Sequence, residues 1–258
     1  MARLLEVRGL TKKYYAGTTE SRAVNNINLE VDEEEFVIIM GASGSGKTSL
    51  LHLIAGIDDF DEGRIHYKNT DYGNMGEKAK TIFRRTNLGI VFQQHCLIPD
   101  LTVYENIMLP MMLDRRKGAG RKEKAVMKET ILKLCERFGL EEHIGKYPSQ
   151  LSGGQQQRAA VLRAIVNTPP LLLCDEPTGN LNSAQTDIVM RLLSILNKNG
   201  QTIILVTHDI KVAVRGKRVV FIKDGSIGGE LIFSGMYMKE DSQKREEELM
   251  EFLQKRNW

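Results

Sequence analysis

The residues with the clearest chemistry are Gly41 to Thr48, which read GASGSGKT. This run fits the phosphate-binding pattern G-x-x-x-x-G-K-[ST] without a mismatch. Its glycines let successive backbone N–H groups converge on phosphate oxygens, and the N-terminus of the following helix adds partial positive charge. In this pattern Lys47 reaches the β- and γ-phosphates and the Thr48 hydroxyl ligates Mg²⁺. The stretch therefore predicts a binding site for a nucleoside triphosphate.

Further polar side chains follow apolar runs that read as buried strands. Asp175 and Glu176 end one run, Gln93 ends another, and His208 follows a third. The carboxyl ends of strands are where open α/β sheets bind ligands. There Asp175 is suited to hold Mg²⁺, Glu176 to polarise an attacking water, and Gln93 to sense either. For His208, a structural role is the alternative to a catalytic one.

A second anion site is indicated at Ser152–Gln155, where Ser-Gly-Gly precedes a predicted helix and offers backbone N–H groups without a lysine. Two phosphate-binding loops in one chain favour a dimer. In it, each nucleotide lies between the phosphate loop of one subunit and the Ser-Gly-Gly of the other. Near the N-terminus, the ring of Tyr14 or Tyr15 could stack on the base, with a half-packed surface tyrosine as the alternative.

The elements that must position these residues alternate between strand and helix. Phe36–Met40 and the later apolar runs are continuous, as expected for a parallel sheet that is covered on both faces. Strands around Leu5–Val7 and Ile27–Val31 alternate and are expected to pair antiparallel. Residues from Gln93 to about Pro148 are predicted to form a helical insertion. The charged tail Lys239–Trp258 carries a narrow apolar stripe, which predicts a terminal helix docked on its own domain or on a partner.

Composition limits the classes of function. The 258 residues are 41% apolar and 27% charged, which is ordinary for a globular protein, and the net charge of +3 is too small to argue for nucleic acid. Three cysteines without C-x-x-C spacing, Cys96, Cys135 and Cys174, are predicted to be reduced thiols. Nothing at the N-terminus indicates secretion, and no apolar run reaches the roughly 20 residues that span a bilayer. We therefore expect any role at a membrane to run through a partner.

Two surface segments have open interpretations. Leu97 and Ile98 follow Gln93 in an irregular stretch that predicts a docking groove, with packing into the helical insertion as the alternative. A basic cluster is predicted to be a solvated face, with contact to anionic lipid headgroups as the alternative. It consists of Arg115, Arg116, Lys117, Arg121, Lys122 and Lys124.

The stretch LSGGQQQR, at residues 151–158, resembles the signature motif of ATP-binding-cassette (ABC) ATPases. The other motifs are similar to that family's and come in its order: Walker A at 41–48, Gln93 as the Q-loop glutamine, and LLLCDE as Walker B. Pro177–Leu181 resembles the start of the D-loop, His208 the switch histidine, and Tyr14 the aromatic A-loop position. The similarity runs from about Arg3 to Leu231.

The resemblance implies an α/β fold: a P-loop NTPase core with a mainly parallel sheet, an N-terminal antiparallel β subdomain and an inserted α-helical subdomain. The ATPase domain is expected at 1–235, with the helical subdomain at about 94–166, and a charged C-terminal helix at 236–258. The implied cofactors are ATP and Mg²⁺. The implied partners are a second copy of the chain, in a head-to-tail dimer, and a membrane permease that holds this cytoplasmic subunit on the inner face of the membrane.

The implied site residues are carried over motif by motif. The catalytic ones are Lys47, Gln93, Glu176 and His208. Mg²⁺ is expected on Thr48, Gln93 and Asp175. The nucleotide-binding ones are Tyr14, Gly41, Ala42, Ser43, Gly44, Ser45, Gly46, Lys47, Thr48, Ser49, Gln93, Ser152, Gly153, Gly154, Gln155 and Asp175.

One position departs from the family pattern. Asn182 stands where the family usually has an aspartate that ties the D-loop to the opposite subunit, which puts strict coupling of the two ATP sites in doubt. Asn182 also suits a helix N-cap.

Details such as DEPTGNL are most similar to the branch of macrolide export, lipoprotein release, division-site regulation and bacitracin-type resistance, and the last seven residues resemble its antimicrobial-peptide resistance members. Export of, or resistance to, such peptides is therefore expected. A regulatory ATPase that moves no substrate is the alternative, whereas a DNA-repair ATPase, a translation factor or a P-loop kinase fits less well.

Overall fold

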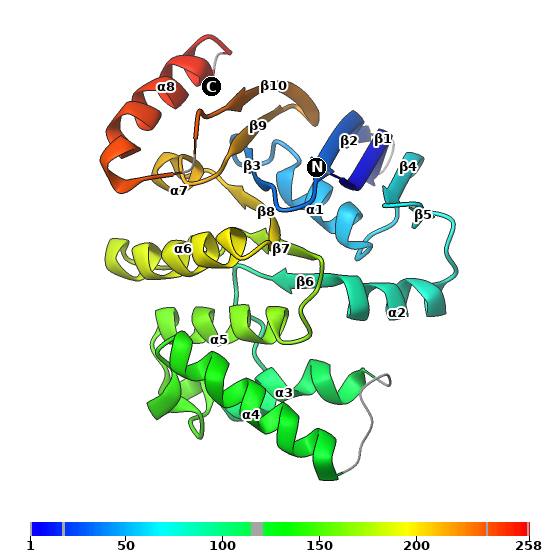
Figure 1. The fold of residues 1–258 in the computed structure, drawn as a ribbon. Helices are drawn as coiled ribbons and strands as arrows, with labels where there is room; N and C mark the ends of the chain where they lie inside the picture. Colours follow the sequence, from blue (N-terminus) through cyan, green and yellow to red (C-terminus); the bar gives the residue numbers. More distant parts are fainter. Residues whose placement is uncertain (1, 17–18, 115–120, 236, 257) are drawn as a thin grey trace. The chain divides into compact units, whose positions relative to one another are not determined.

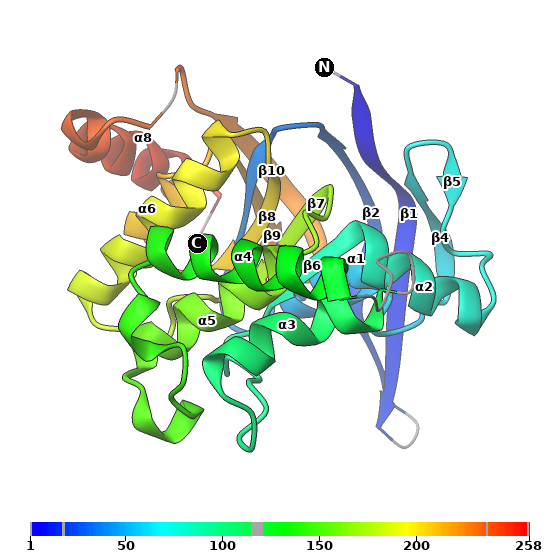
Figure 2. The ribbon, with the colours of Figure 1, turned by 60° about the horizontal axis from the view of Figure 1, so that its bottom comes forward.

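The computed structural model describes residues 2–16, 19–114, 121–235, 237–256 and 258 (Figures 1 and 2). Its contacts divide the chain into two compact units. The first unit consists of Met1–Thr81 and Leu196–Trp258, and the second unit of Ile82–Ile195. The boundaries expected for the helical subdomain stay a prediction. Three of the six residues of the basic cluster, Arg115, Arg116 and Lys117, lie outside the described residues.

The first unit contains an antiparallel sheet with the strand order β2-β1-β4-β5. These strands are β1 (Arg3–Ala16), β2 (Thr19–Asp32), β4 (Glu62–Tyr67) and β5 (Thr70–Asp71). β1 and β2 pair antiparallel, as predicted, and extend beyond the alternating segments. Register shifts along this pair interrupt the alternation, which is why the sequence pattern indicates shorter strands.

The same unit contains the strand that leads into the phosphate loop. β3 (Phe36–Met40) pairs in parallel with β8 (Thr202–Thr207) on one side and β9 (Arg218–Lys223) on the other. β10 (Ser226–Ile232) pairs antiparallel with β9. All five residues of β3 are buried, as the continuous apolar run predicts. The helices α1 (Lys47–Ala55) and α7 (Ile210–Ala213) follow β3 and β8.

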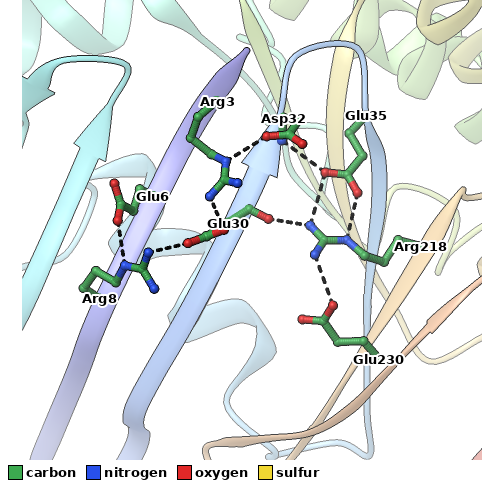
Figure 3. Close-up of polar contacts among 8 residues, drawn as sticks. All are labelled: Arg3, Glu6, Arg8, Glu30, Asp32, Glu35, Arg218 and Glu230. Carbon is green, nitrogen blue, oxygen red and sulfur yellow. Dashed lines mark hydrogen bonds and ion pairs between the residues drawn. The ribbon is translucent and has the colours of Figure 1, made fainter. Parts of the chain in front are cut away.

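A half-buried arginine joins the strands of the first unit. Arg218 in β9 forms ion pairs with Glu35 at 2.8 Å and with Glu230 of β10 at 3.1 Å, and it also donates to the backbone carbonyl of Glu30 in β2 (Figure 3). Arg218 and Glu35 keep only 12% and 18% of their side chains exposed, so solvent screens this pair weakly. Arg218 therefore ties β2, β9 and β10 together beside the strand that carries the phosphate loop.

The C-terminal helix α8 (Ser242–Gln254) docks on its own unit. Leu249, Phe252 and Leu253 are buried, and Arg245 is only 4% exposed. The Arg245 guanidinium lies 4.7 Å from the ring of Phe233. It donates hydrogen bonds of 3.0 to 3.3 Å to the carbonyl oxygens of Val214, Gly216, Ser234 and Gly235. Of the two placements predicted for the tail helix, the structure has the one on its own domain.

The second unit combines two parallel strands with helices. β6 (Leu88–Val91) pairs in parallel with β7 (Leu171–Asp175), and both are largely buried. The helices are α3 (Val103–Leu113), α4 (Arg121–Arg137) and α5 (Gly153–Ile165), and α3 contacts both of the others (Figure 1). α2 (Glu77–Asn87) begins in the first unit, and α6 (Ser183–Lys198) ends there. Within the described part of the chain, no helix is long and apolar enough to cross a membrane.

Candidate nucleotide site

The phosphate loop begins where β3 ends. Gly44 and Gly46 have left-handed φ angles of 79° and 101°. A β-carbon on Gly46 would lie 2.0 Å from the carbonyl oxygen of Ala23, so only glycine fits there. α1 starts at Lys47 and carries no acidic residue in its first turn. The partial positive charge of this helix end is therefore not offset by a neighbouring carboxylate on the helix.

Lys47 is held inside the loop that it serves. It is 5% exposed, and its Nζ donates a 2.7 Å hydrogen bond to the carbonyl oxygen of Ala42. A buried ammonium needs such acceptors, and phosphate oxygens are the strongest alternative that a ligand can offer. Thr48 is exposed in the first turn of α1 and Ser49 is half-buried beside it.

Tyr14 and Tyr15 have different surroundings. The Tyr14 hydroxyl donates a 2.7 Å hydrogen bond to Asp58, and Lys12 lies over its ring at 5.2 Å. The pKa of Tyr14 is raised above its ordinary value, mainly by burial of the phenol and secondly by the hydrogen bond to Asp58. The hydroxyl therefore keeps its proton. Tyr15 is 66% exposed, and its hydroxyl donates a 3.3 Å hydrogen bond to Glu20 in the same hairpin. Tyr14 is therefore the fixed ring of the two.

Strand register brings His208 to the edge that carries the phosphate loop. Met40 of β3 lies opposite Thr207 of β8, so the segments that follow leave the same end of neighbouring parallel strands. His208 is exposed there. The next residue, Asp209, caps α7 by accepting a 2.8 Å hydrogen bond from the Lys211 N–H. The cap fixes where the chain turns after His208.

The second unit repeats this arrangement with different residues. Val91 of β6 lies opposite Cys174 of β7, so Gln93 and Asp175 are at the same edge of this parallel pair. Asp175 is 8% exposed. Glu176 is half-buried and has a left-handed φ of 42°, a conformation that non-glycine residues adopt rarely and that is enriched at functional sites.

The side chains of Gln93 and Glu176 both lie close to Gly179. A β-carbon at Gly179 would lie 3.0 Å from Gln93 Nε2 and 3.3 Å from Glu176 Oε2. The Gly179 N–H donates to the Glu176 carbonyl at 3.0 Å, and Asn180 Nδ2 donates to the Gln93 carbonyl at 3.4 Å. The structure thus gathers the predicted water-polarising carboxylate and the predicted sensor around one loop.

The Ser-Gly-Gly motif begins α5 with a capping box. Ser152 Oγ accepts from the Gln155 N–H at 3.4 Å, and Gln155 Oε1 accepts from the Ser152 N–H at 2.8 Å. A β-carbon on Gly154 would come within 2.9 Å of Gln185 in α6, so this glycine allows the two helix starts to approach. Asn182 Oδ1 accepts from the Gln185 N–H at 2.9 Å. This hydrogen bond confirms the prediction that Asn182 caps the N-terminus of the following helix, α6.

Some residues of the site carry no sequence signal that we recognised. Asp58, which anchors Tyr14, lies in an acidic turn without a motif. Trp258 is separated from the phosphate loop by more than 200 residues of sequence. It nevertheless lines a hollow of about 480 Å³ together with Ala42–Ser45 and Phe221–Asp224. A distant aromatic residue of this kind is not linked to a motif by spacing or periodicity.

Known ABC transporter proteins are similar to this chain in sequence and in structure. The ABC transporter family matches residues 24–179. The uncharacterised ABC transporter ATP-binding protein MJ0796 of Methanocaldococcus jannaschii is 42% identical over 229 residues, which cover 88% of this chain and 96% of the relative. The lipoprotein-releasing system ATP-binding protein LolD of Syntrophotalea carbinolica is 40% identical, over 88% of this chain and 98% of the relative. A solved dimeric structure of MJ0796 aligns with a TM-score of 0.83 at 39% identity and covers 90% of this chain and all of that one.

A second solved structure of MJ0796 is a dimer in a post-hydrolysis state, bound to ADP and phosphate. It aligns with a TM-score of 0.81 at 40% identity. The strand, glycine-rich loop and helix at residues 36–55, set in an α/β fold, define a phosphate-loop nucleotide-binding ATPase. The chain belongs to the ABC transporter family, as one of its ATP-binding cassettes.

Proposed function

We propose that this chain is the ATP-hydrolysing subunit of a membrane ABC transporter, in which ATP binding closes two copies head to tail and hydrolysis reopens them to drive a permease. The observation that carries the proposal is that the side chains of Gln93 and Glu176 both lie close to Gly179. A carboxylate and an amide at one loop are suited to orient and activate a water molecule. The dimeric structures of the relative MJ0796 support the two-subunit arrangement.

The proposed roles divide between the two units. In the first, the phosphate loop and Lys47 hold the β- and γ-phosphates, the ring of Tyr14 stacks on the base, and His208 contacts the terminal phosphate. In the second, Glu176 takes a proton from the attacking water. Ser152 and Gly154 at the start of α5 bind the terminal phosphate of the nucleotide held by the other copy. Each ATP would then be enclosed only when both copies are present.

Mg²⁺ fits the donors assigned to it. The Thr48 hydroxyl, the Asp175 carboxylate and the Gln93 amide oxygen are hard oxygen donors, the type that this ion prefers, and phosphate oxygens and water commonly complete its shell. Among the described residues, no three His, Cys, Asp or Glu side chains gather as a metal site. When bound, the ion would neutralise phosphate charge. The oxygen donors proposed for it would be the Thr48 hydroxyl, the Asp175 carboxylate and the Gln93 amide.

The permease is proposed to dock on the segment after Gln93. Ile98 is 38% exposed and Leu97 is half-buried. Asn106 is fully buried and fixes the backbone of this segment through hydrogen bonds to Ile98, of 2.8 Å to its N–H and 3.1 Å to its carbonyl. A rigid backbone that presents an apolar side chain is suited to receive a short partner helix. Such docking would hold the subunit on the inner face of the cell membrane.

For the substrate, we propose export of, or resistance to, antimicrobial peptides, on the resemblance of the chain's last residues to that group. The relative LolD belongs to a lipoprotein-releasing system, which supports the wider branch. Deleting the gene for this chain should then raise sensitivity to a bacitracin-type peptide. If sensitivity is unchanged although the protein still co-purifies with a membrane complex, the alternative of a regulatory ATPase gains support.

The test of the enzymatic step is Glu176→Gln. The amide cannot accept a proton, so turnover should fall about 10²- to 10⁴-fold while ATP affinity is retained. Phosphate release and equilibrium nucleotide titration measure the two quantities. Glu129→Gln is the control, since Glu129 is exposed on α4 and pairs with Lys133 at 2.7 Å. Near wild-type turnover in Glu176→Gln would remove Glu176 from the role of base.

A further inference from the structure

An arginine from a different helix holds the loop after Gln93. Arg163 lies in α5, and its guanidinium donates to the carbonyl oxygen of Cys96 at 2.5 Å and to that of His95 at 3.0 Å. Arg163 is half-buried. The planar fork of a guanidinium can serve two neighbouring acceptors at once, which a lysine ammonium does with less geometric control.

The two residues that Arg163 binds have an uncommon backbone conformation. His95 and Cys96 both have left-handed φ angles, of 57° and 49°. Non-glycine residues rarely adopt this region, and two in succession persist only where the surroundings hold them. Arg163 supplies such a hold on both carbonyls. Because His95 is only two residues beyond Gln93, the same contacts constrain the backbone from which the Gln93 side chain projects.

The helix that carries Arg163 also carries the second phosphate-binding motif. α5 begins at Gly153, with Ser152 as its N-cap, and Arg163 lies near its end. At 1.5 Å of rise per residue, the two positions are roughly 15 Å apart along one continuous helix. A helix of this length moves as a rigid rod, so a displacement at Ser152 also displaces Arg163.

The far end of the loop is fixed from another helix. Asn106 of α3 donates from Nδ2 to the carbonyl oxygens of Ile98 at 3.1 Å and Leu101 at 2.9 Å. The loop thus has two separate attachments. One leads to α5 through Arg163 and the other to α3 through Asn106.

We propose that Arg163 is a positioning residue that makes the Gln93 loop follow the Ser152-Gly153-Gly154 end of α5 when that end engages nucleotide. The proposal rests on the functions proposed above for Gln93 and Ser152. It assigns Arg163 no contact with ATP. Its effect should therefore appear in turnover and in loop order, with nucleotide binding by the phosphate loop preserved.

The first experiment separates binding from turnover. In Arg163→Ala, turnover at saturating ATP should fall at least tenfold while the affinity for a fluorescent ATP analogue stays within about twofold. Arg163→Lys should recover turnover only in part. Arg85→Ala is the matched control, because Arg85 also donates to a backbone carbonyl, that of Leu113 at 2.7 Å, which belongs to α3 and not to the loop after Gln93. It should keep wild-type turnover, and equal turnover in Arg163→Ala and the wild type would overturn the proposal.

A double-mutant cycle tests the route of the effect. If Arg163 acts through the Gln93 loop, then adding Arg163→Ala to Gln93→Ala should lower turnover less than twofold further. A merely structural role of Arg163 would multiply the two losses. If the loss of turnover in the double variant equals the product of the two single losses, the proposal is overturned, even if Arg163→Ala alone has a low turnover.

A spectroscopic measurement tests the hold on the loop without ATP hydrolysis. Cys96 is exposed, whereas Cys135 and Cys174 are buried, so a nitroxide reagent should label Cys96 selectively in the folded protein. The label should become more mobile in Arg163→Ala and in Arg163→Lys, and should not change in Arg85→Ala. Unchanged mobility in both Arg163 variants would overturn the proposal.

Failure of the proposed function can be recognised separately. An inactive wild type, or a Gln93→Ala variant with full turnover, would count against the roles given to this site in hydrolysis. The mobility of the label at Cys96 would still decide whether Arg163 fixes the loop. The lysine variant serves if the alanine variant does not fold.

Discussion

The hydroxyl of Tyr14 donates a 2.7 Å hydrogen bond to Asp58. This bond holds the ring of Tyr14, and not that of Tyr15, in one position beside the turn that contains Asp58. These polar contacts favour Tyr14 over Tyr15 as the ring that we propose to stack on the base. The edge of the ring is anchored, and 43% of Tyr14 stays accessible to a ligand.

We predict that Tyr14→Ala weakens ATP binding about tenfold, since stacking of a base on an aromatic ring contributes on the order of 1–3 kcal/mol. Tyr14→Phe keeps the ring and should stay much closer to wild type. Tyr15→Ala is the control and should bind normally, because Tyr15 is 66% exposed and its hydroxyl bonds Glu20 of its own hairpin. Titration with ATP decides the matter, and a larger loss in Tyr15→Ala than in Tyr14→Ala would reverse the assignment.

We predict that the Glu176→Gln variant is mainly monomeric without nucleotide and dimeric with ATP and Mg²⁺. The reason is that hydrolysis would be blocked while both phosphate-binding loops stay intact. Light scattering at several protein concentrations measures the mass. Adding Lys47→Ala, which removes the ammonium held at Ala42 in the phosphate loop, should abolish the increase. A mass that never changes with ATP at high protein concentration would argue against the head-to-tail dimer.

We predict that Leu97→Asp and Ile98→Asp leave the chain folded and able to bind ATP but prevent co-purification with the permease. A buried carboxylate in an apolar contact is costly to desolvate. Leu132→Asp is the control, because Leu132 is 39% exposed on α4, about as much as Ile98. Circular dichroism, ATP titration and affinity purification from solubilised membranes are measured together. Normal co-purification of both variants would place the docking site elsewhere.

We predict that Arg245→Ala lowers the free energy of unfolding by about 3 kcal/mol, since it leaves four carbonyl oxygens, two of them in buried hydrogen bonds, without their charged donor. Urea denaturation followed by circular dichroism measures the change. Arg22→Ala should leave the midpoint unchanged, because Arg22 forms an exposed pair with Glu20. Equal stability of Arg245→Ala and the wild type would mean that the hydrogen bonds of Arg245 contribute little to the stability of the fold.

The elements that the sequence predicts are those whose signals lie in neighbouring residues. The strand Phe36–Met40, the glycine-rich loop and α1 follow directly from an apolar run, a spacing of glycines and a helical period. The strand ends that carry Gln93 and Glu176 follow in the same way. Their shared edge is confirmed by the parallel register of β6 and β7.

Arg163, Asn106 and Arg245 could not be found in this way. Each acts by binding backbone carbonyls that are remote in sequence or lie in irregular segments, and a backbone carbonyl has no sequence signature. In a sequence pattern, all three read as ordinary polar positions of helices. The sequence pattern also does not predict the strand β10, because Gly228 and Gly229 interrupt the alternation of its apolar residues.

Trp258 is the single tryptophan of the sequence, and it lines the hollow next to Ala42–Ser45. Indole emission depends on the polarity and contacts of the ring, and 44% of this residue is exposed. All of the protein's tryptophan fluorescence therefore originates beside the phosphate loop. The chain carries its own optical reporter of that loop, so nucleotide arrival and departure can be timed on unlabelled protein.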